Sequence, residues 1–214
     1  IYALTDEYAV GDDAVSRRRP KVMAWDVDAD SPWIELADGP ADNTGYRAAA
    51  LCDGTLFLFG GARPAEGEEL DLLDQCWAFD IDRREWSSRQ PLPLRLRDAT
   101  ATAIDRRFIA VVGGVLDASP TSHEARDTPV ILSTQCFIYD TEEDDFAAIT
   151  PLYQAVADHG LVCFDSRLWA VGGEDSIHRS RTALVQQAKI GDVLSSRVVR
   201  SHEQKKSVFG SRKK

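Results

Sequence analysis

The sequence has no apolar run of the roughly 18 residues that a transmembrane helix needs, so we expect no membrane span. It also lacks an excess of basic residues, with 25 Lys and Arg against 35 Asp and Glu and a formal net charge of −10. Because nucleic-acid phosphates are bound by an excess of Lys and Arg, this balance argues against DNA or RNA as a partner. No CxxC, HxH or HxxxH spacing is present, so we expect no metal site.

Cysteine is scarce, and each of the four residues lies in a short apolar run that is typical of a strand. A free thiol packs there as a small hydrophobic side chain. This structural role is the favoured interpretation, with a disulfide as the alternative, for Cys52, Cys76, Cys136 and Cys163. Their spacing does not require an oxidising compartment, so the sequence leaves the cellular location open.

The strongest signal that is present is an internal repeat with two markers. The first is an apolar run that ends in Gly-Gly, and it occurs at 55–61 (TLFLFGG), 108–114 (FIAVVGG) and 168–173 (LWAVGG). The second is an aromatic residue followed by Asp, and then by a large aromatic residue: Asp26 with Trp33, Asp80 with Trp86, and Asp140 with Phe146. The two markers move along the chain together, so they belong to one repeating unit.

Each unit is predicted to form four short strands. The first strand is rich in Ala, Thr and Val, the second ends in Gly-Gly, the third ends in aromatic-Asp, and the fourth begins near the Trp or Phe. Asp53-Gly54 predicts a tight hairpin between the first two strands, and Asp165-Ser166 gives a weaker signal of the same kind. Four antiparallel strands in about 50 residues are typical of a propeller blade.

The Gly-Gly, aromatic-Asp and Trp set resembles kelch repeats over about residues 20–190. The resemblance implies an all-β, kelch-type β-propeller with about three to four four-stranded antiparallel blades in a partial ring. We expect Trp86 and Phe146 to be buried between blades, since a large ring fills the gap between twisted sheets. The expected organisation is a partial blade at 1–39, blades at 45–93 and 97–152, a partial blade at 157–190, and a disordered basic tail at 195–214.

A closed ring in this family has about six blades, so the repeats account for roughly half a ring. An open array leaves strand edges unpaired, which favours either further blades outside this sequence or closure by a second copy. We therefore expect self-association through the open blade edges. The tail fits no repeat, and a basic arm for an anionic partner is the alternative to disorder there.

Charged side chains are expected to gather on one face of the propeller. The loops between the second and third strands of each blade, and the loops between blades, should emerge on the same side and hold functional residues on a rigid scaffold. Arg97, Asp98, Asp158 and His159 lie in the loops between blades. Mixed Arg and carboxylate groups suit a polar, anionic small ligand or a protein partner.

The segment 171–185 (VGGEDSIHRSRTALV) resembles the corresponding motif of N-acetylneuraminate epimerases, the kelch-type sialic acid mutarotases. The resemblance implies that Glu174 is the proton acceptor and that Arg181 binds the substrate carboxylate. The spacing is one residue longer than the family pattern, so Arg179 is the alternative clamp. The alternative to a site is a structural role, in which Glu174 caps a turn or forms an ion pair with Arg181. The other expected substrate contacts are Arg97, His159 and Asp158.

Mutarotation requires a base within reach of the anomeric hydroxyl, and a carboxylate supplies it without metal or cofactor. A planar Arg fork matches the carboxylate of a sugar acid. The first function class is therefore a cofactor-free isomerase that binds a carbohydrate acid. The second is a kelch interaction module that grips a partner protein on its loop face without catalysis. Galactose oxidase-like relatives of the fold hold copper with Tyr and His, and no matching set is found.

Overall fold

The computed structural model describes residues 1–5, 8–10, 15–17, 20–29, 31–40, 45–65, 70–116, 130–175 and 180–195, with the backbone alone at 8–10, 15–17 and 64. Strands make up nearly all of the regular structure in these ranges. Residues 190–195 are helical, and they begin shortly before the position where we expected the basic tail to start. Beyond Ser195 the tail lies outside the described residues.

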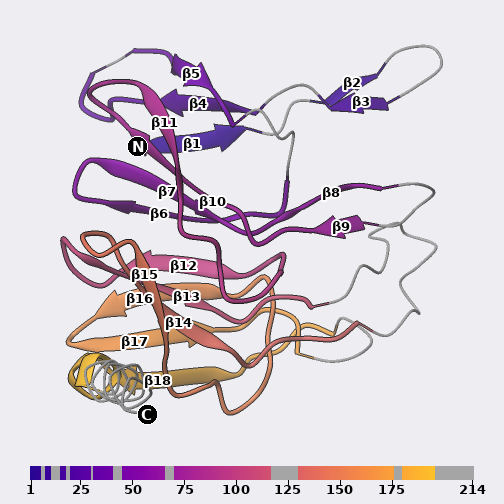
Figure 1. Ribbon diagram of the computed structural model, residues 1–214, viewed down its shortest axis with the longest axis vertical. Helices are drawn as coiled ribbons and strands as arrows, with labels where there is room; N and C mark the ends of the chain where they lie inside the picture. Colours follow the sequence, from indigo (N-terminus) through magenta and orange to yellow (C-terminus); the bar gives the residue numbers. More distant parts are fainter. Residues whose placement is uncertain are drawn as a thin grey trace, which may run out of the picture.

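Four antiparallel sheets follow one another along the chain, and we number them blades 1 to 4 (Figure 1). Blade 1 contains β1 (Tyr2–Thr5), β4 (Lys21–Ala24) and β5 (Ile34–Asp38). Blade 2 contains β6 (Ala48–Cys52), β7 (Thr55–Phe59), β10 (Cys76–Asp80) and β11 (Glu85–Arg89). Blade 3 contains β12 (Thr100–Ala103), β13 (Phe108–Val112), β14 (Cys136–Asp140) and β15 (Asp145–Ala148). Blade 4 contains β16 (Gly160–Phe164), β17 (Arg167–Val171) and β18 (Val185–Lys189).

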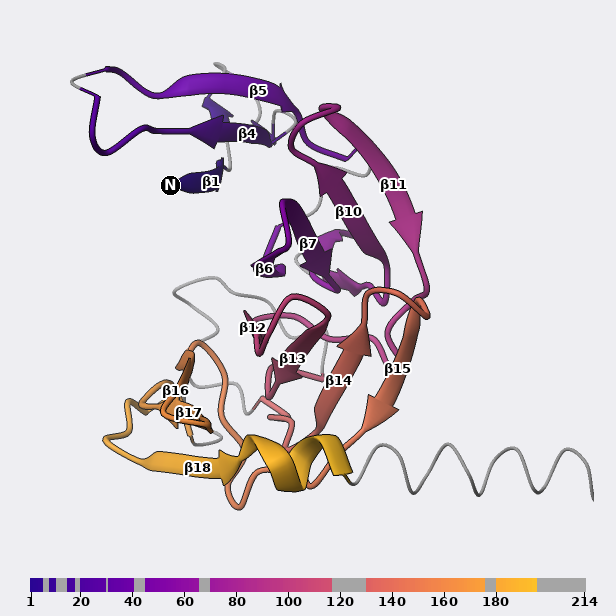
Figure 2. The same cartoon turned by 90° about the vertical axis from the view of Figure 1, so that its left-hand side faces the viewer.

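The blades are arranged as an arc, with β6, β12 and β16 on the inner side and β11 and β15 on the outer side (Figure 2). Two short hairpins extend from blades 1 and 2 on the same side of the molecule (Figure 1): β2 (Tyr8–Val10) with β3 (Val15–Arg17), and β8 (Ala62–Pro64) with β9 (Leu70–Leu72). This arrangement confirms the expected all-β, kelch-type propeller blades in a partial ring.

Tight turns join the first two strands of blades 2 and 4 as the sequence predicts. Asp53 and Gly54 both have positive φ, 44° and 75°, and so do Asp165 and Ser166, at 49° and 56°. Positive φ at both central residues defines the hairpin turn whose twist matches that of the flanking strands. The registers Cys52 with Thr55 and Phe164 with Arg167 follow from these turns.

An aromatic pair recurs in every unit with the aromatic-Asp marker, and in blades 2 and 3 it fills the gap to the preceding blade. Trp25–Trp33, Phe79–Trp86 and Tyr139–Phe146 have ring centroids 5.8, 4.9 and 4.8 Å apart, and all three pairs are tilted. The second pair packs against blade 1, where Trp86 Nε1 donates a hydrogen bond to the Asp38 carbonyl (2.7 Å). The third packs against Phe57 and Phe59 of blade 2.

The expectation that Trp86 and Phe146 are buried is wrong in degree, because both rings are half-buried. They do lie between blades, in contact with the cores that join blades 1 and 2 and blades 2 and 3. Their strands β11 and β15 are the outermost of each blade (Figure 2), so one side of each ring remains open to solvent. In the second and third pairs the fully buried member comes from the third strand, as Phe79 and Tyr139.

The Gly-Gly marker forms the joint between consecutive blades. The Gly61 N–H donates to the Leu96 carbonyl (2.8 Å), and the Gly114 N–H donates to the Val156 carbonyl (2.9 Å). A Cβ on the preceding glycine would collide with the same carbonyl, at 2.5 Å from Leu96 O for Gly60 and at 2.4 Å from Val156 O for Gly113. Only glycine permits this approach of the next blade, which explains the marker physically.

The cysteines are all free, and three of them are buried. Burial raises the pKa of the Cys76 thiol to about 12 and that of Cys136 to about 11, so both stay protonated at neutral pH. They act as small apolar side chains in the cores between blades, where Cys76 and Cys136 belong to successive clusters. In the described ranges no helix has the length and apolar character needed to cross a membrane.

Both ends of the arc expose apolar side chains whose counterparts in the middle of the arc are covered by a neighbouring blade. Trp33 on blade 1 is 44% exposed, although its counterparts Trp86 and Phe146 pack on a preceding blade. On blade 4, Val162 and Phe164 are 49% and 70% exposed, on the face that points away from blade 3. These two surfaces, which we call the open faces, are blade faces without a described neighbour.

We expect the chain to self-associate through the open faces, because contiguous exposed apolar surface favours association. Sedimentation velocity at rising protein concentration should show a growing sedimentation coefficient. Trp33→Glu and Phe164→Glu should each suppress this growth. Ile131→Glu is the matched control, since Ile131 is 62% exposed but lies on neither open face, and it should leave the association unchanged. A concentration-independent monomer would contradict the prediction.

Candidate functional site

The residue after each Gly-Gly pair connects the loops that surround the inner strands. Ala62 in blade 2 pairs with Gly45 and with Leu72. Val115 in blade 3 pairs with Arg97 and Leu132, and Glu174 in blade 4 pairs with Ala157 and Arg181. Glu174 and Arg181 therefore occupy structurally equivalent positions to two apolar pairs, Ala62–Leu72 and Val115–Leu132.

In blades 2 and 3 the first member of this pair belongs to the core, since Ala62 is 0% and Val115 is 4% exposed. In blade 4 an acidic residue, Glu174, and a positively charged residue, Arg181, stand in place of the apolar pair. The Glu174 side chain is 19% exposed and the Arg181 side chain 76%, and Arg181 Nη2 lies 3.6 Å from Glu174 Oε1. The antiparallel bridge between the two backbones holds both side chains on the same side, so the sequence-based pairing of these residues is also a spatial one.

The loops between blades are linked by a chain of backbone hydrogen bonds. Tyr46, Asp98 and Asp158 stand at equivalent positions and all adopt left-handed φ, at 58°, 54° and 49°. The Asp98 N–H donates to the Tyr46 carbonyl and the Asp158 N–H donates to the Asp98 carbonyl, both at 3.1 Å. Asp tolerates this conformation better than most residues, and the repeat thereby brings two carboxylates to the loops of adjacent blades.

Asp98 is the most strongly perturbed acid near Glu174. Burial raises its pKa to about 6, the Arg97 guanidinium opposes this effect, and the negative charges of Asp158 and Glu174 add to it. Arg97 is 3% exposed, and its Nη1 donates to Asp98 Oδ2. Asp98 is therefore partly protonated near neutral pH, which lets it hold or release a proton, whereas Arg97 is committed to orienting it.

His159 lies inside the molecule, 5% exposed, where Gly113 and Gly173 of two consecutive blades meet. Burial lowers its pKa to about 4, so the ring is neutral at pH 7. No described residue makes a hydrogen bond with either ring nitrogen. A Cβ added at Gly173 would lie 2.8 Å from His159 Cβ, and one added at Gly113 would lie 3.0 Å from its Cε1, so His159 packs closely between blades 3 and 4.

The structure thus brings together Glu174 with Arg181 and Arg97 with Asp98, and the charge of Glu174 acts on Asp98. Asp158 is exposed on the neighbouring loop, His159 is buried beneath it, and Arg179 lies outside the described residues. The sequence analysis places Asp98 on the loop face but gives it no chemical role. Asp98 and Asp158 each lie two residues before the first strand of their blade, Thr100 and Gly160, so an alignment of the repeats on that strand would have shown them at one position. Groups of His, Cys, Asp and Glu that could hold a metal ion do not occur among the described residues.

Comparison with known proteins finds two Kelch-like proteins and one solved structure that are similar to this chain. The chain is 27% identical over 178 residues to Kelch-like protein 35 of Mus musculus, which covers 83% of this chain and 27% of that protein. It is 29% identical over 157 residues to Kelch-like protein 25 of Xenopus tropicalis, covering 72% of this chain and 24% of that protein. The solved structure of YjhT superposes with a TM-score of 0.67 at 15% identity, covering 89% of this chain and 62% of the other.

The chain has the fold of kelch-type β-propeller blades. No protein-family model matches it. The chain spans about a quarter of the length of the two Kelch-like proteins. The likeness to YjhT, at 15% identity, establishes the fold and leaves the chemistry to be argued from this chain's own residues.

The buried His159 should make folding stability fall as the pH is lowered. Its pKa is depressed on folding from 6.5 to about 4, so the stabilising effect of the neutral ring is complete above pH 6.5 and is lost as the pH falls toward 4. Urea denaturation gives the free energy of unfolding of the wild type and of His159→Gln. The wild-type value minus the variant value should decrease by about 3 kcal/mol as the pH is lowered over this range. Because Asp98 titrates in both proteins, its opposite contribution cancels. A pH-independent difference would show that His159 is solvated.

Proposed function

We propose that the loop face of this kelch chain binds a sugar acid and catalyses its mutarotation, with Glu174 as the base and Arg181 as the carboxylate clamp. The observation that carries the proposal is that Glu174 and Arg181 stand in blade 4 where blades 2 and 3 have an apolar pair, among the blades in which this position is described. A half-buried carboxylate at a core position lowers packing stability, so its presence favours a chemical role.

Arg181 suits the clamp because its guanidinium is 76% exposed and only loosely engaged by Glu174. Their separation of 3.6 Å is longer than the roughly 2.7–2.9 Å of a charge-assisted hydrogen bond, so a ligand carboxylate competes well for the guanidinium fork. Binding of that carboxylate would also release Glu174 for the anomeric hydroxyl. Asp158, exposed on the neighbouring loop, supplies an acceptor for sugar hydroxyl groups.

The two acids near this point fit the two proton transfers of mutarotation. Glu174 takes the proton of the anomeric hydroxyl, the bond from the anomeric carbon to the ring oxygen breaks, and the ring oxygen needs a proton. Asp98, with its pKa near 6, is the group best poised to give that proton and to take it back on reclosure at the other face. Arg97 orients Asp98 and does not itself touch the sugar.

A second candidate function is a protein-interaction module without catalysis. The open faces favour it, because Trp33, Phe164 and Val162 present apolar surface of the kind that protein partners cover. In this case the loop face would also meet the partner, and the Glu174–Arg181 ion pair would stay closed on the surface.

NMR titration with N-acetylneuraminate tests the first proposal. Millimolar ligand should shift the backbone resonances of Gly173, Glu174 and Arg181, and magnetisation exchange should show faster interconversion of the two anomers. Arg181→Lys should weaken binding about tenfold, because an ammonium cannot form the planar two-bond fork. Glu174→Gln should keep binding and abolish the acceleration.

The matched control is Arg63→Lys, since Arg63 pairs with Asp71 on the equivalent hairpin of blade 2 at 2.6 Å and is assigned no ligand contact. It should change neither affinity nor rate. Absence of ligand-induced shifts near Glu174 would exclude the sugar-acid site and leave the interaction module. Binding with an unaccelerated anomer exchange in the wild type would remove the catalytic part alone.

A further inference from the structure

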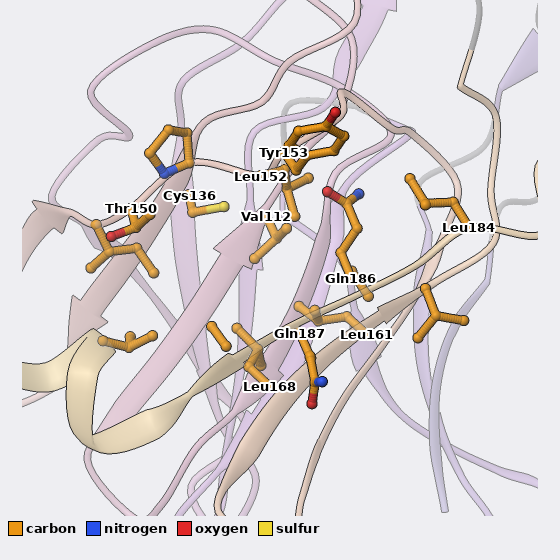
Figure 3. A pocket seen from close by; sticks show the side chains of 16 residues that line it. Val112, Cys136, Thr150, Leu152, Tyr153, Leu161, Leu168, Leu184, Gln186 and Gln187 are labelled. Atoms are coloured by element: carbon orange, nitrogen blue, oxygen red, sulfur yellow. The ribbon is translucent and has the colours of Figure 1, made fainter.

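A cavity of about 410 Å³ lies between blades 3 and 4, and neither Glu174 nor Arg181 lines it. Figure 3 shows its walls, which come from β13, β14, β16, β17 and β18, from the connection after β15, and from the helical residues 190–195. The lining is mostly aliphatic, as in Val112, Leu161, Leu168 and Leu152. Its volume falls within the roughly 300–1,000 Å³ of small-molecule pockets.

The strand registers explain why the cavity exists. Phe79 pairs with Leu56, Tyr139 with Ile109, and Ala188 with Leu168, so Ala188 occupies the place of a buried aromatic ring. Two residues earlier, Gln186 stands where blades 2 and 3 have Trp77 and Phe137. Blade 4 therefore lacks two of the rings with which blades 2 and 3 fill the gap to the preceding blade.

A third ring is missing because the chain changes course after β18. In blades 2 and 3 the fourth strand follows four residues after the third and brings in Trp86 or Phe146. After β18 the corresponding residues 190–195 are helical, and Val193, 4% exposed, packs into the core between blades 3 and 4. This helical segment stands at the place of a fourth strand and closes one side, but it fills less space than the aromatic strand does.

The mouth of the cavity carries groups that suit a ligand. The Gln186 side chain both accepts from the Gln154 N–H and donates to the Gln154 carbonyl, each at 3.0 Å, which fixes β18 to the connection between the blades. Tyr153 stands at the rim and is 94% exposed (Figure 3). A flat ring entering the cavity would meet aliphatic walls inside and a Tyr face at the entrance.

We propose that this cavity is a binding site for a small planar aromatic molecule of about the size of indole. The ligand takes the place of the rings that Phe79 with Trp86 and Tyr139 with Phe146 supply in the other gaps. In blades 2 and 3 the fourth strand, β11 or β15, lies beside the third strand, β10 or β14. In blade 4 the helical segment occupies the equivalent place beside β18, so a free molecule fits better than a strand of a partner. The site is independent of the proposed sugar-acid site.

Methyl NMR with indole as the probe tests the proposal on the full chain. Indole should produce saturable shifts in the methyl groups of Leu161, Leu168 and Val112, and none in Leu58, which lies in the core between blades 1 and 2. Cyclohexanol, which is non-aromatic, should bind at least about threefold more weakly. Tyr153→Ala should weaken indole binding severalfold without affecting cyclohexanol.

Ala188→Phe should abolish indole binding and raise Tm, because it restores the chain's own ring at that position. Ala188→Leu is the milder variant and should weaken binding if the Phe variant does not fold. Val162→Phe adds a ring on the opposite face of blade 4 and should leave the indole affinity unchanged. Undiminished indole binding by Ala188→Leu, or equal affinity for cyclohexanol, would overturn the proposal, as would the absence of saturable shifts.

Discussion

The structure depends above all on the contact between each Gly-Gly pair and the loop that enters the next blade. The Gly61 and Gly114 N–H groups bind the Leu96 and Val156 carbonyls, and the absence of side chains at Gly60 and Gly113 lets those carbonyls approach. This joint sets the distance between consecutive sheets at the ends of their second strands. The aromatic pairs then fill the wider outer gap, so two sequence markers serve two ends of the same interface.

The same joint builds the polar face. It places the residue after Gly-Gly beside the incoming loop, and it draws the left-handed residues Asp98 and Asp158 into one hydrogen-bonded series. Where the following residue is Ala62 or Val115 the position belongs to the core, and where it is Glu174 it becomes a charged site. Function in this fold is thus added by changing side chains at positions whose backbone the joints already fix.

The repeat could be predicted from sequence because it rests on local requirements. Gly-Gly and the Asp-Gly turn reflect backbone geometry, and the aromatic-Asp marker reflects an aromatic ring at a fixed point of the blade. Together they predicted the strands and the type of blade. The half-burial of Trp86, the raised pKa of Asp98 and the cavity beside Ala188 were not predicted, since each depends on what a neighbouring blade covers or leaves open. Glu174 and Arg181 were found by resemblance. That they stand where blades 2 and 3 have an apolar pair could be seen only by comparing the blades in the structure.

Replacement of equivalent glycines tests the joint most directly. Gly113 and Gly172 have nearly the same φ, 68° and 66°, so Gly→Ala has the same backbone cost at both. A Cβ at Gly113 would lie 2.4 Å from Val156 O, whereas at Gly172 the nearest described atom is Thr182 O at 3.4 Å. Urea denaturation should show that Gly113→Ala loses at least about 2 kcal/mol more free energy of unfolding than Gly172→Ala. Equal losses would contradict the claim that this contact holds the blades together.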